Sequence, residues 1–203
     1  MKLYFTFIKH FQNFLLALSI GILLVLPSLI VFYPTLIGAN ASMNLYNYSH
    51  YVLFLVMIIR PLADIFTQAK FIRPLVILRK GMGVLSASVA VSFILAKIMV
   101  GPAAFFANYA TAAYWSPVNM ILFAHLADIS AILLIATSNN YSKRLLGANW
   151  KRLQRLSYVY FYGSSLFVAY TYGHIDVILS MIIVTVLTLV AFIKNRNRAR
   201  VAQ

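Results

Sequence analysis

Six long apolar stretches occupy most of this chain and constrain its fold more than any other feature. They cover residues 12–36, 45–59, 81–101, 118–137, 153–172 and 175–193. A helix that rises 1.5 Å per residue needs about 20 apolar residues to cross the ~30 Å hydrocarbon core of a bilayer. The composition agrees, because 63% of the residues are hydrophobic and only 10% are charged. We therefore predict an all-α integral membrane bundle of six transmembrane helices, forming one domain over residues 1–203.

The basic residues predict how this bundle is oriented. Six crossings would put both termini on the same side of the membrane, and sixteen of the seventeen Lys and Arg residues fall in the segments on that side. The exception is Lys97. Because positive charge is concentrated in cytoplasmic loops, we expect a multi-pass protein of the bacterial cytoplasmic (inner) membrane with both termini in the cytoplasm.

The net charge of +14 predicts that the basic clusters bind an anionic partner. They lie in short loops where membrane topology already requires them, so we expect contact with anionic membrane lipids and no binding of nucleic acid. The chain contains no cysteine, which excludes disulfides, iron–sulfur clusters and thiolate chemistry.

The connections between the apolar stretches differ in character. Residues 60–80 form a basic linker interrupted by Pro61 and Pro74, and residues 195–203 form a polar tail that we expect to fray. Between the third and fourth stretches, Tyr114 and Trp115 are expected to anchor an interfacial segment at the level of the lipid headgroups.

Small residues mark two helix faces that we expect to pack closely against other helices. Ser88, Ser92 and Ala96 recur every four residues in the third stretch, and Gly163 begins a Gly-Ser-Ser sequence in the fifth. Without a hydrophobic drive between helices in lipid, small side chains permit the close approach on which association depends. A path for a substrate is the alternative interpretation of these faces.

A set of residues between positions 60 and 168 forms a recognisable pattern, most specific in residues 137–154, a short basic hinge. The pattern consists of Pro61-Leu62-Ala63, Arg79-Lys80, Gly83, Thr137-Ser138, Arg144, Leu146, Gly147, Trp150 and Leu153. With these residues the segment resembles the ferric-reductase-like transmembrane family, and within it the haem-binding membrane subunit of the bacterial methionine sulfoxide reductase system.

The resemblance implies a b-type haem held by histidines on the third and fifth helices. The corresponding positions in this chain are Phe93, Gln154 and Phe167. Phenylalanine has no lone pair and an amide is a poor donor to iron, so we expect that the scaffold is kept and that no haem is bound there.

Loss of a haem would leave a cavity, which is costly in a packed bundle. Large aromatic side chains of the third and fifth helices are candidates to refill it, namely Phe93, Tyr158, Phe161, Tyr162 and Phe167. Alternatively, these aromatic residues face lipid.

His125 and Asp128 are the strongest remaining candidates for chemistry. They lie three residues apart inside the fourth apolar stretch, hence on one helix face, and ionisable residues within the membrane are functional candidates by default. The pair would serve as a haem or metal ligand with its orienting carboxylate, as a proton relay, or as a polar packing contact. Lys97 is a second possible partner for Asp128.

Two functions follow as expectations. The first is a haem-free structural or accessory subunit of a membrane complex, with other membrane protein subunits as partners and no enzymatic activity of its own. The second is an electron-transfer subunit of an oxidoreductase that binds haem b through relocated ligands, His125 and His50. Because the sequence lacks a glycine-rich nucleotide-binding motif, the second function would need a separate electron donor.

Overall fold

The computed structural model describes residues 2–118 and 120–201, and every regular element in that part of the chain is a helix. The prediction of an all-α fold is confirmed. The long helices are α1 (Lys2–Phe32), α2 (Ala39–Ile65), α4 (Leu78–Val100), α6 (Ile121–Thr137), α9 (Leu156–Tyr172) and α10 (Ile175–Val201). The short elements are α3 (Ile72–Leu75), α5 (Pro102–Tyr109), the 3₁₀ helix η1 (Ala112–Trp115), α7 (Asn140–Leu146) and α8 (Ala148–Leu153).

Four helical segments in the described part are long and apolar enough to cross a membrane, which is fewer than the six predicted. They are α1, α2, α3 together with α4, and α10. The chain reaches five if α6 and α7 count as one segment, although these helices meet at 98°. The helices α6 and α9 have only 17 residues each. A turn stops α6 early, because the Asn139 side chain accepts a hydrogen bond from the Ser142 backbone N–H at 2.7 Å and starts α7 in a new direction.

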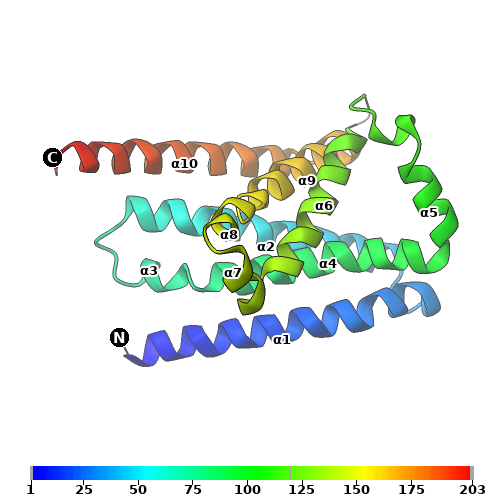
Figure 1. Cartoon of the computed structure of the whole chain (residues 1–203), viewed down its shortest axis with the longest axis horizontal. Coiled ribbons are helices and arrows are strands. Elements are labelled where there is room, and N and C mark those ends of the chain that lie inside the picture. The colour runs from blue at the N-terminus through cyan, green and yellow to red at the C-terminus, as the bar shows by residue number, and fades with distance from the viewer. Residues whose placement is uncertain (1, 119, 202–203) are drawn as a thin grey trace.

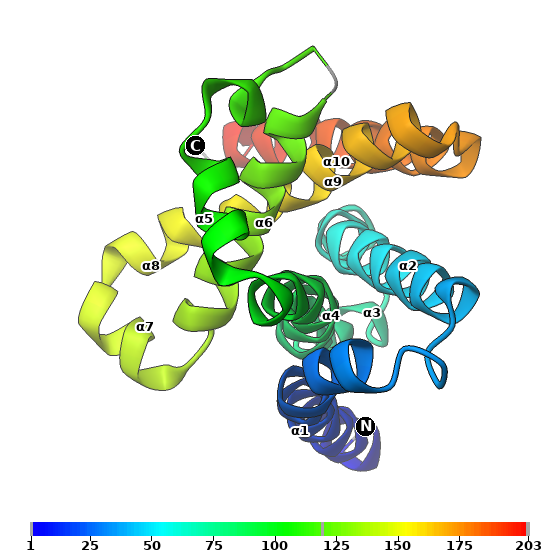
Figure 2. The ribbon, with the colours of Figure 1, turned by 90° about the vertical axis from the view of Figure 1, so that its right-hand side faces the viewer.

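The helices run roughly side by side, with both ends of the described chain at one end of the bundle (Figure 1). The start of α1, the end of α10 and the α3 segment lie there, whereas α5 caps the opposite end. A view along the bundle shows α1 and α10 on opposite flanks, with α2 and α4 between them (Figure 2). The short helices α7 and α8 project to one side.

The small-residue face of α4 packs against α1, as predicted. Ser88 and Ser92 are fully buried, and the Ser92 hydroxyl donates to the Ile22 carbonyl oxygen of α1 at 3.3 Å. At Gly81 the helices are so close that an added Cβ would lie 3.1 Å from the Leu15 Cβ. Close packing of small residues therefore holds α1 in place.

Among the glycines of the described chain, Gly163 marks the closest approach of two helices, α6 and α9. A Cβ built on Gly163 would lie 2.7 Å from the Phe123 carbonyl oxygen and 3.3 Å from the Ala127 Cβ. Glycine is the only residue that fits at this crossing, because the atom that a Cβ would strike belongs to the backbone of α6 and cannot rotate away as a side chain can. The glycine predicted to allow close packing is thus required by the geometry.

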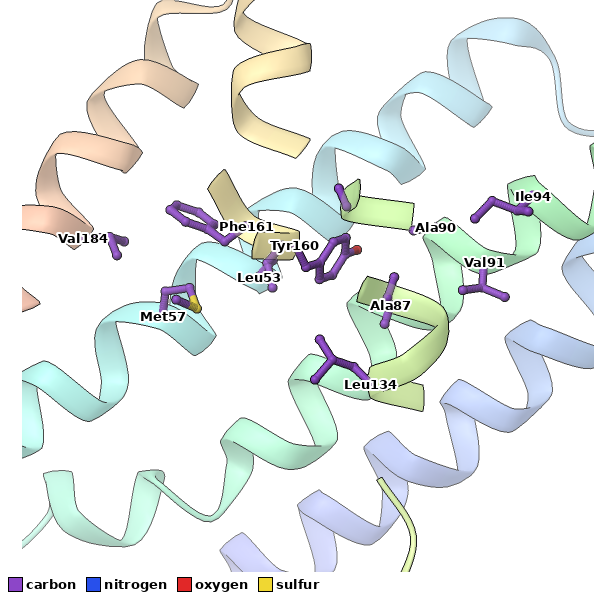
Figure 3. Packing of buried hydrophobic residues seen from close by; sticks show 12 residues of the cluster. Leu53, Met57, Ala87, Ala90, Val91, Ile94, Leu134, Tyr160, Phe161 and Val184 are labelled. Atoms are coloured by element: carbon purple, nitrogen blue, oxygen red, sulfur yellow. The ribbon is translucent and has the colours of Figure 1, made fainter. Parts of the chain in front are cut away.

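The core lies where α2, α4, α6, α9 and α10 meet. Phe161 and Tyr160 of α9 enter it from one side, and Leu53, Met57 and Val184 surround them. Figure 3 shows the Tyr160 ring reaching from α9 toward α4, where Ala87 and Ala90 lie. Small residues on α4 therefore leave room for aromatic residues on α9.

The predicted linker and tail are more ordered than the sequence suggested. α2 continues through Pro61 to Ile65, and α3 forms within residues 60–80. α10 continues to Val201, while residues 202 and 203 lie outside the described part. The reason is a polar contact between helix ends: Lys194 Nζ donates to the Ile65 carbonyl oxygen at 2.7 Å, and Arg198 donates to the Asp64 carbonyl oxygen at 3.2 Å. Cations at the carboxyl end of α2 also suit the helix dipole.

Substitution of Gly163 by alanine tests the α6–α9 crossing. The new methyl group would force the helices apart, and we expect a loss of about 1–3 kcal/mol in stability. Thermal unfolding in detergent measures it, with Gly21→Ala as the matched control, because nothing lies within 4 Å of a Cβ at Gly21. An unchanged unfolding temperature for Gly163→Ala would show that the crossing is loose.

Candidate functional site

Two of the cavities lined by described residues lie toward opposite ends of the bundle. The first, here called the aromatic cavity, has a volume of about 530 Å³ and lies toward the α5 end. Its walls include Tyr46, Phe93, Tyr109, His125 and Phe167. The second, here called the basic cavity, has a volume of about 440 Å³ and lies toward the end that holds α3. Its rim carries four cationic side chains, from Arg60, Arg79, Lys80 and Lys151.

Tyr160 is the one side chain that lines both cavities in the described part of the chain. It is 4% exposed, and its hydroxyl lies 3.2 Å from the Ser86 hydroxyl and 3.3 Å from the Ser86 carbonyl oxygen. The ring is therefore fixed across the interior by contacts to α4. It forms a partition between the two cavities.

The three positions at which the resemblance implies haem ligands divide between these cavities. Phe93 of α4 and Phe167 of α9 line the aromatic cavity, and Gln154, the residue that follows α8, lines the basic cavity. Phe93 contacts Tyr46 edge to face, with ring centroids 6.2 Å apart. The three positions therefore do not share one cavity.

The aromatic residues named as candidates to fill a lost haem site divide between the core and the aromatic cavity. Phe161 is fully buried in the core, and Tyr158 and Tyr162 pack against the same cluster. Phe93 and Phe167 are only half-buried and border a cavity of about 530 Å³. Aromatic residues therefore fill the centre of the bundle but leave room for a ligand beside α4 and α9.

His125 of α6 lies in a box of aromatic rings. Tyr114 stacks on its ring with centroids 4.0 Å apart, and Tyr109 and Trp115 lie at 5.2 and 5.6 Å. The Trp115 indole N–H donates to the Tyr109 carbonyl oxygen at 2.8 Å, which closes the box. Tyr114 and Trp115, which the sequence predicts to anchor an interfacial segment, both contact the His125 ring.

Both ring nitrogens of His125 are buried, and neither makes a hydrogen bond of regular geometry within the described part of the protein, although the Tyr114 backbone lies close to the ring. An unpaired buried imidazole is costly. One neutral ring nitrogen donates and the other accepts, so His125 has the capacity to bind a polar group of a ligand in the aromatic cavity.

Asp128 lines the same cavity as His125, but no hydrogen bond joins the two side chains. Lys97 also lines this cavity and is exposed. Among the described residues, neither Lys97 nor His125 lies within 4.0 Å of the Asp128 carboxylate as an ion pair. The spacing of three residues correctly puts both side chains on one face, whereas their direct contact is not formed.

His50 lies apart from His125 and lines a different, much smaller cleft. Its Nε2 atom lies 3.2 Å from the Ser165 hydroxyl of α9, and its ring stacks on Phe161 at 5.9 Å. His50 thus links α2 to α9 within the core.

Tyr109 and Tyr114 add polar groups to the aromatic cavity. Burial raises the pKa of Tyr109 to about 12, and the nearby charge of Asp128 contributes to this rise. Burial likewise raises the pKa of Tyr114. Both phenols therefore stay neutral at physiological pH and keep a proton that they can donate to a ligand.

Tyr109 and Tyr160 were not among the residues singled out from the sequence. The density of aromatic residues in 101–117 was a signal for Tyr109, but nothing in the sequence indicated that this segment folds back onto His125. Tyr160 is one of several aromatic residues in its helix. Tyr160 differs from the other aromatic residues of α9 only in its packing, because it borders both cavities.

No protein-family model matches the chain, and comparisons with curated proteins and with solved structures find no significant similarity. Within residues 2–118 and 120–201, no group of three or more His, Asp or Glu side chains is arranged to hold a metal ion.

The two buried histidines differ in hydrogen bonding, and this difference is testable. We expect His125→Phe to leave the unfolding temperature unchanged or to raise it, because no hydrogen bond is lost. His50→Phe would leave the Ser165 hydroxyl unpaired, at a cost of about 1–3 kcal/mol. Thermal unfolding of both variants in detergent measures the contrast. Equal destabilisation would mean that His125 has a protein partner.

Proposed function

We propose that this chain is a six-span protein of the bacterial cytoplasmic membrane with both termini in the cytoplasm. The start of α1 and the end of α10 lie at the same end of the bundle (Figure 1), as an even number of crossings requires. In the topology predicted from the sequence, sixteen of the seventeen Lys and Arg residues fall on the side of the termini, which agrees with the positive-inside rule. Helices α6 and α9, at 17 residues each, span about 25 Å and fall at the short limit for a crossing.

We further propose that the bundle retains a ferric-reductase-like arrangement, binds no haem, and acts as a structural or accessory subunit of a larger membrane complex. One observation carries this proposal. α4 and α9 present Phe93 and Phe167 to the aromatic cavity, where the resemblance implies imidazoles. Phenylalanine provides no lone pair to iron.

The arrangement of the histidines also supports a haem-free protein. An iron held from both axial sides needs two imidazoles that face one site. His125 and His50 line separate cavities, and the Nε2 of His50 is already engaged with Ser165. In this arrangement they do not form a ligand pair.

A role as a subunit fits the large apolar surfaces of the flanking helices. Of the most apolar 18 residues in α1, and likewise in α10, only 22% are buried against the rest of the chain. These helices therefore have most of their surface free for contact with lipid or with other membrane subunits.

The second candidate, an electron-transfer subunit with haem b, is favoured by one feature. His125 has two unpaired ring nitrogens and lines a cavity of about 530 Å³. In that case His125 would provide one axial ligand, and the other would come from a partner subunit or from a different side chain.

An absorption spectrum distinguishes the two candidates. For protein purified from haem-replete membranes, we expect no stoichiometric haem band in either the oxidised or the reduced state, together with co-purification of a larger complex. A stoichiometric band that shifts on reduction and disappears in His125→Ala would overturn the haem-free proposal and support the second candidate.

The double substitution Phe93→His and Phe167→His tests the scaffold itself. If these positions face each other as in the family that the chain resembles, the variant gains a haem b spectrum because two imidazoles then flank the aromatic cavity. The matched control is Phe106→His with Phe192→His, which adds two imidazoles at exposed positions. Failure of the first variant to gain haem, while remaining folded, would contradict the ferric-reductase-like arrangement.

The topology is testable because the chain has no cysteine. Single cysteines at Gln68 and Ala113, both exposed and at opposite ends of the bundle, report which side each end occupies. With a membrane-impermeant maleimide we expect labelling of Ala113→Cys in intact spheroplasts and of Gln68→Cys only after permeabilisation. The reverse pattern would put both termini outside.

A further inference from the structure

The basic cavity is built from elements that lie far apart in the sequence. Its rim carries Arg60 of α2, Arg79 and Lys80 of α4, and Lys151 of α8. It opens at the end of the bundle where the described chain begins and ends. Convergence of four cations from three helices on one opening is unusual unless an anion occupies it, because like charges repel.

The charges of this cavity are poorly balanced by the protein itself. Asp64 is the nearest ion-pair partner, and it pairs with Arg60 at 3.5 Å. Arg79 is half-buried and donates its Nε–H to the Val56 carbonyl oxygen at 3.0 Å. No carboxylate of the described residues lies within 4.0 Å of Arg79, Lys80 or Lys151. A half-buried guanidinium whose terminal nitrogens have no anionic partner favours an anionic ligand.

A second observation points the same way. Gln154 lines this cavity, and its side-chain Nε2 atom is buried without a hydrogen-bond acceptor. An amide donor has two N–H groups to satisfy, and leaving them unpaired in a buried place is costly. An acceptor oxygen on a ligand in the cavity would satisfy them.

The deeper walls of the cavity are apolar. Leu53, Ala87 and Leu134 belong to the hydrophobic core cluster, and Trp150 stands nearer the rim. A volume of about 440 Å³ exceeds what a phosphate ion fills. The lining therefore suits a molecule with an anionic head and an apolar tail.

We propose that the basic cavity binds the phosphate group of an anionic membrane lipid, with part of an acyl chain against its apolar walls. Arg79 binds the phosphate oxygens through its terminal nitrogens, and Gln154 donates to one of them. Lys80 and Lys151 add positive charge at the rim. This site is separate from the aromatic cavity and does not depend on whether haem is bound there.

Trp150 provides a direct reporter, because it lines the cavity and the chain contains only one other tryptophan. In a Trp115→Phe background, short-chain phosphatidylglycerol is titrated into protein in a neutral detergent while Trp150 fluorescence is followed. We expect a saturable change with phosphatidylglycerol and none with phosphatidylcholine. Inorganic phosphate distinguishes the source: saturation by free phosphate at the same concentration as the lipid would overturn the assignment to a lipid.

Three variants locate the binding site. Arg79→Gln and Gln154→Leu should each weaken phosphatidylglycerol binding by about tenfold, since each removes donors to a charged group. Lys151 is exposed, so Lys151→Gln should fold even if Arg79→Gln does not, and it should also weaken phosphatidylglycerol binding. The matched control is Arg73→Gln, which removes an exposed charge from the same end of the bundle outside the cavity. Equal weakening by Arg73→Gln would show surface attraction only and would overturn the proposal.

Discussion

The close approach of α6 and α9 at Gly163 determines the interior of this protein. Lipid does not drive helices together as water does, so association relies on contact between backbones and small side chains. At Gly163 the two helices approach so closely that only hydrogen fits between them. The two helices that cross there also contribute to the aromatic cavity, which His125 and Asp128 of α6 and Phe167 of α9 line.

Tyr160, a member of the hydrophobic core cluster, borders both cavities. Tyr160 lies just before the crossing and reaches to Ser86 of α4. On one side of it, aromatic rings and His125 surround a cavity with few charges. On the other side, cations from three helices surround the second cavity. The two cavities have different linings, one mainly aromatic and one basic, although α4 and α9 contribute to both. The reason is that the residue types on α4 and α9 change along the length of each helix.

The sequence was informative where the evidence is local. Apolar stretches of membrane-spanning length predicted the six long helices, and the small residues at Ser88, Ser92 and Gly163 predicted where helices pack. Prediction was less accurate where the outcome depends on contacts between distant segments. α2 continues past Arg60 and α10 past Lys194 because their ends bind each other, and neither segment reveals this alone. Likewise, the spacing of His125 and Asp128 predicts that they share a helix face, but it does not predict whether their side chains contact each other. The stacking of Tyr114 on His125 depends on the path of the loop before α6, which the composition of that loop does not predict.

The contact between the end of α2 and the end of α10 has a consequence for biogenesis. α2 is synthesised more than a hundred residues before α10, so its last carbonyl groups enter the membrane surface without the cations that later bind them. Until α10 has been synthesised, water or lipid headgroups must donate the hydrogen bonds that those carbonyl oxygens accept. The contact joins an early helix to a late one, so it forms only after both have been synthesised.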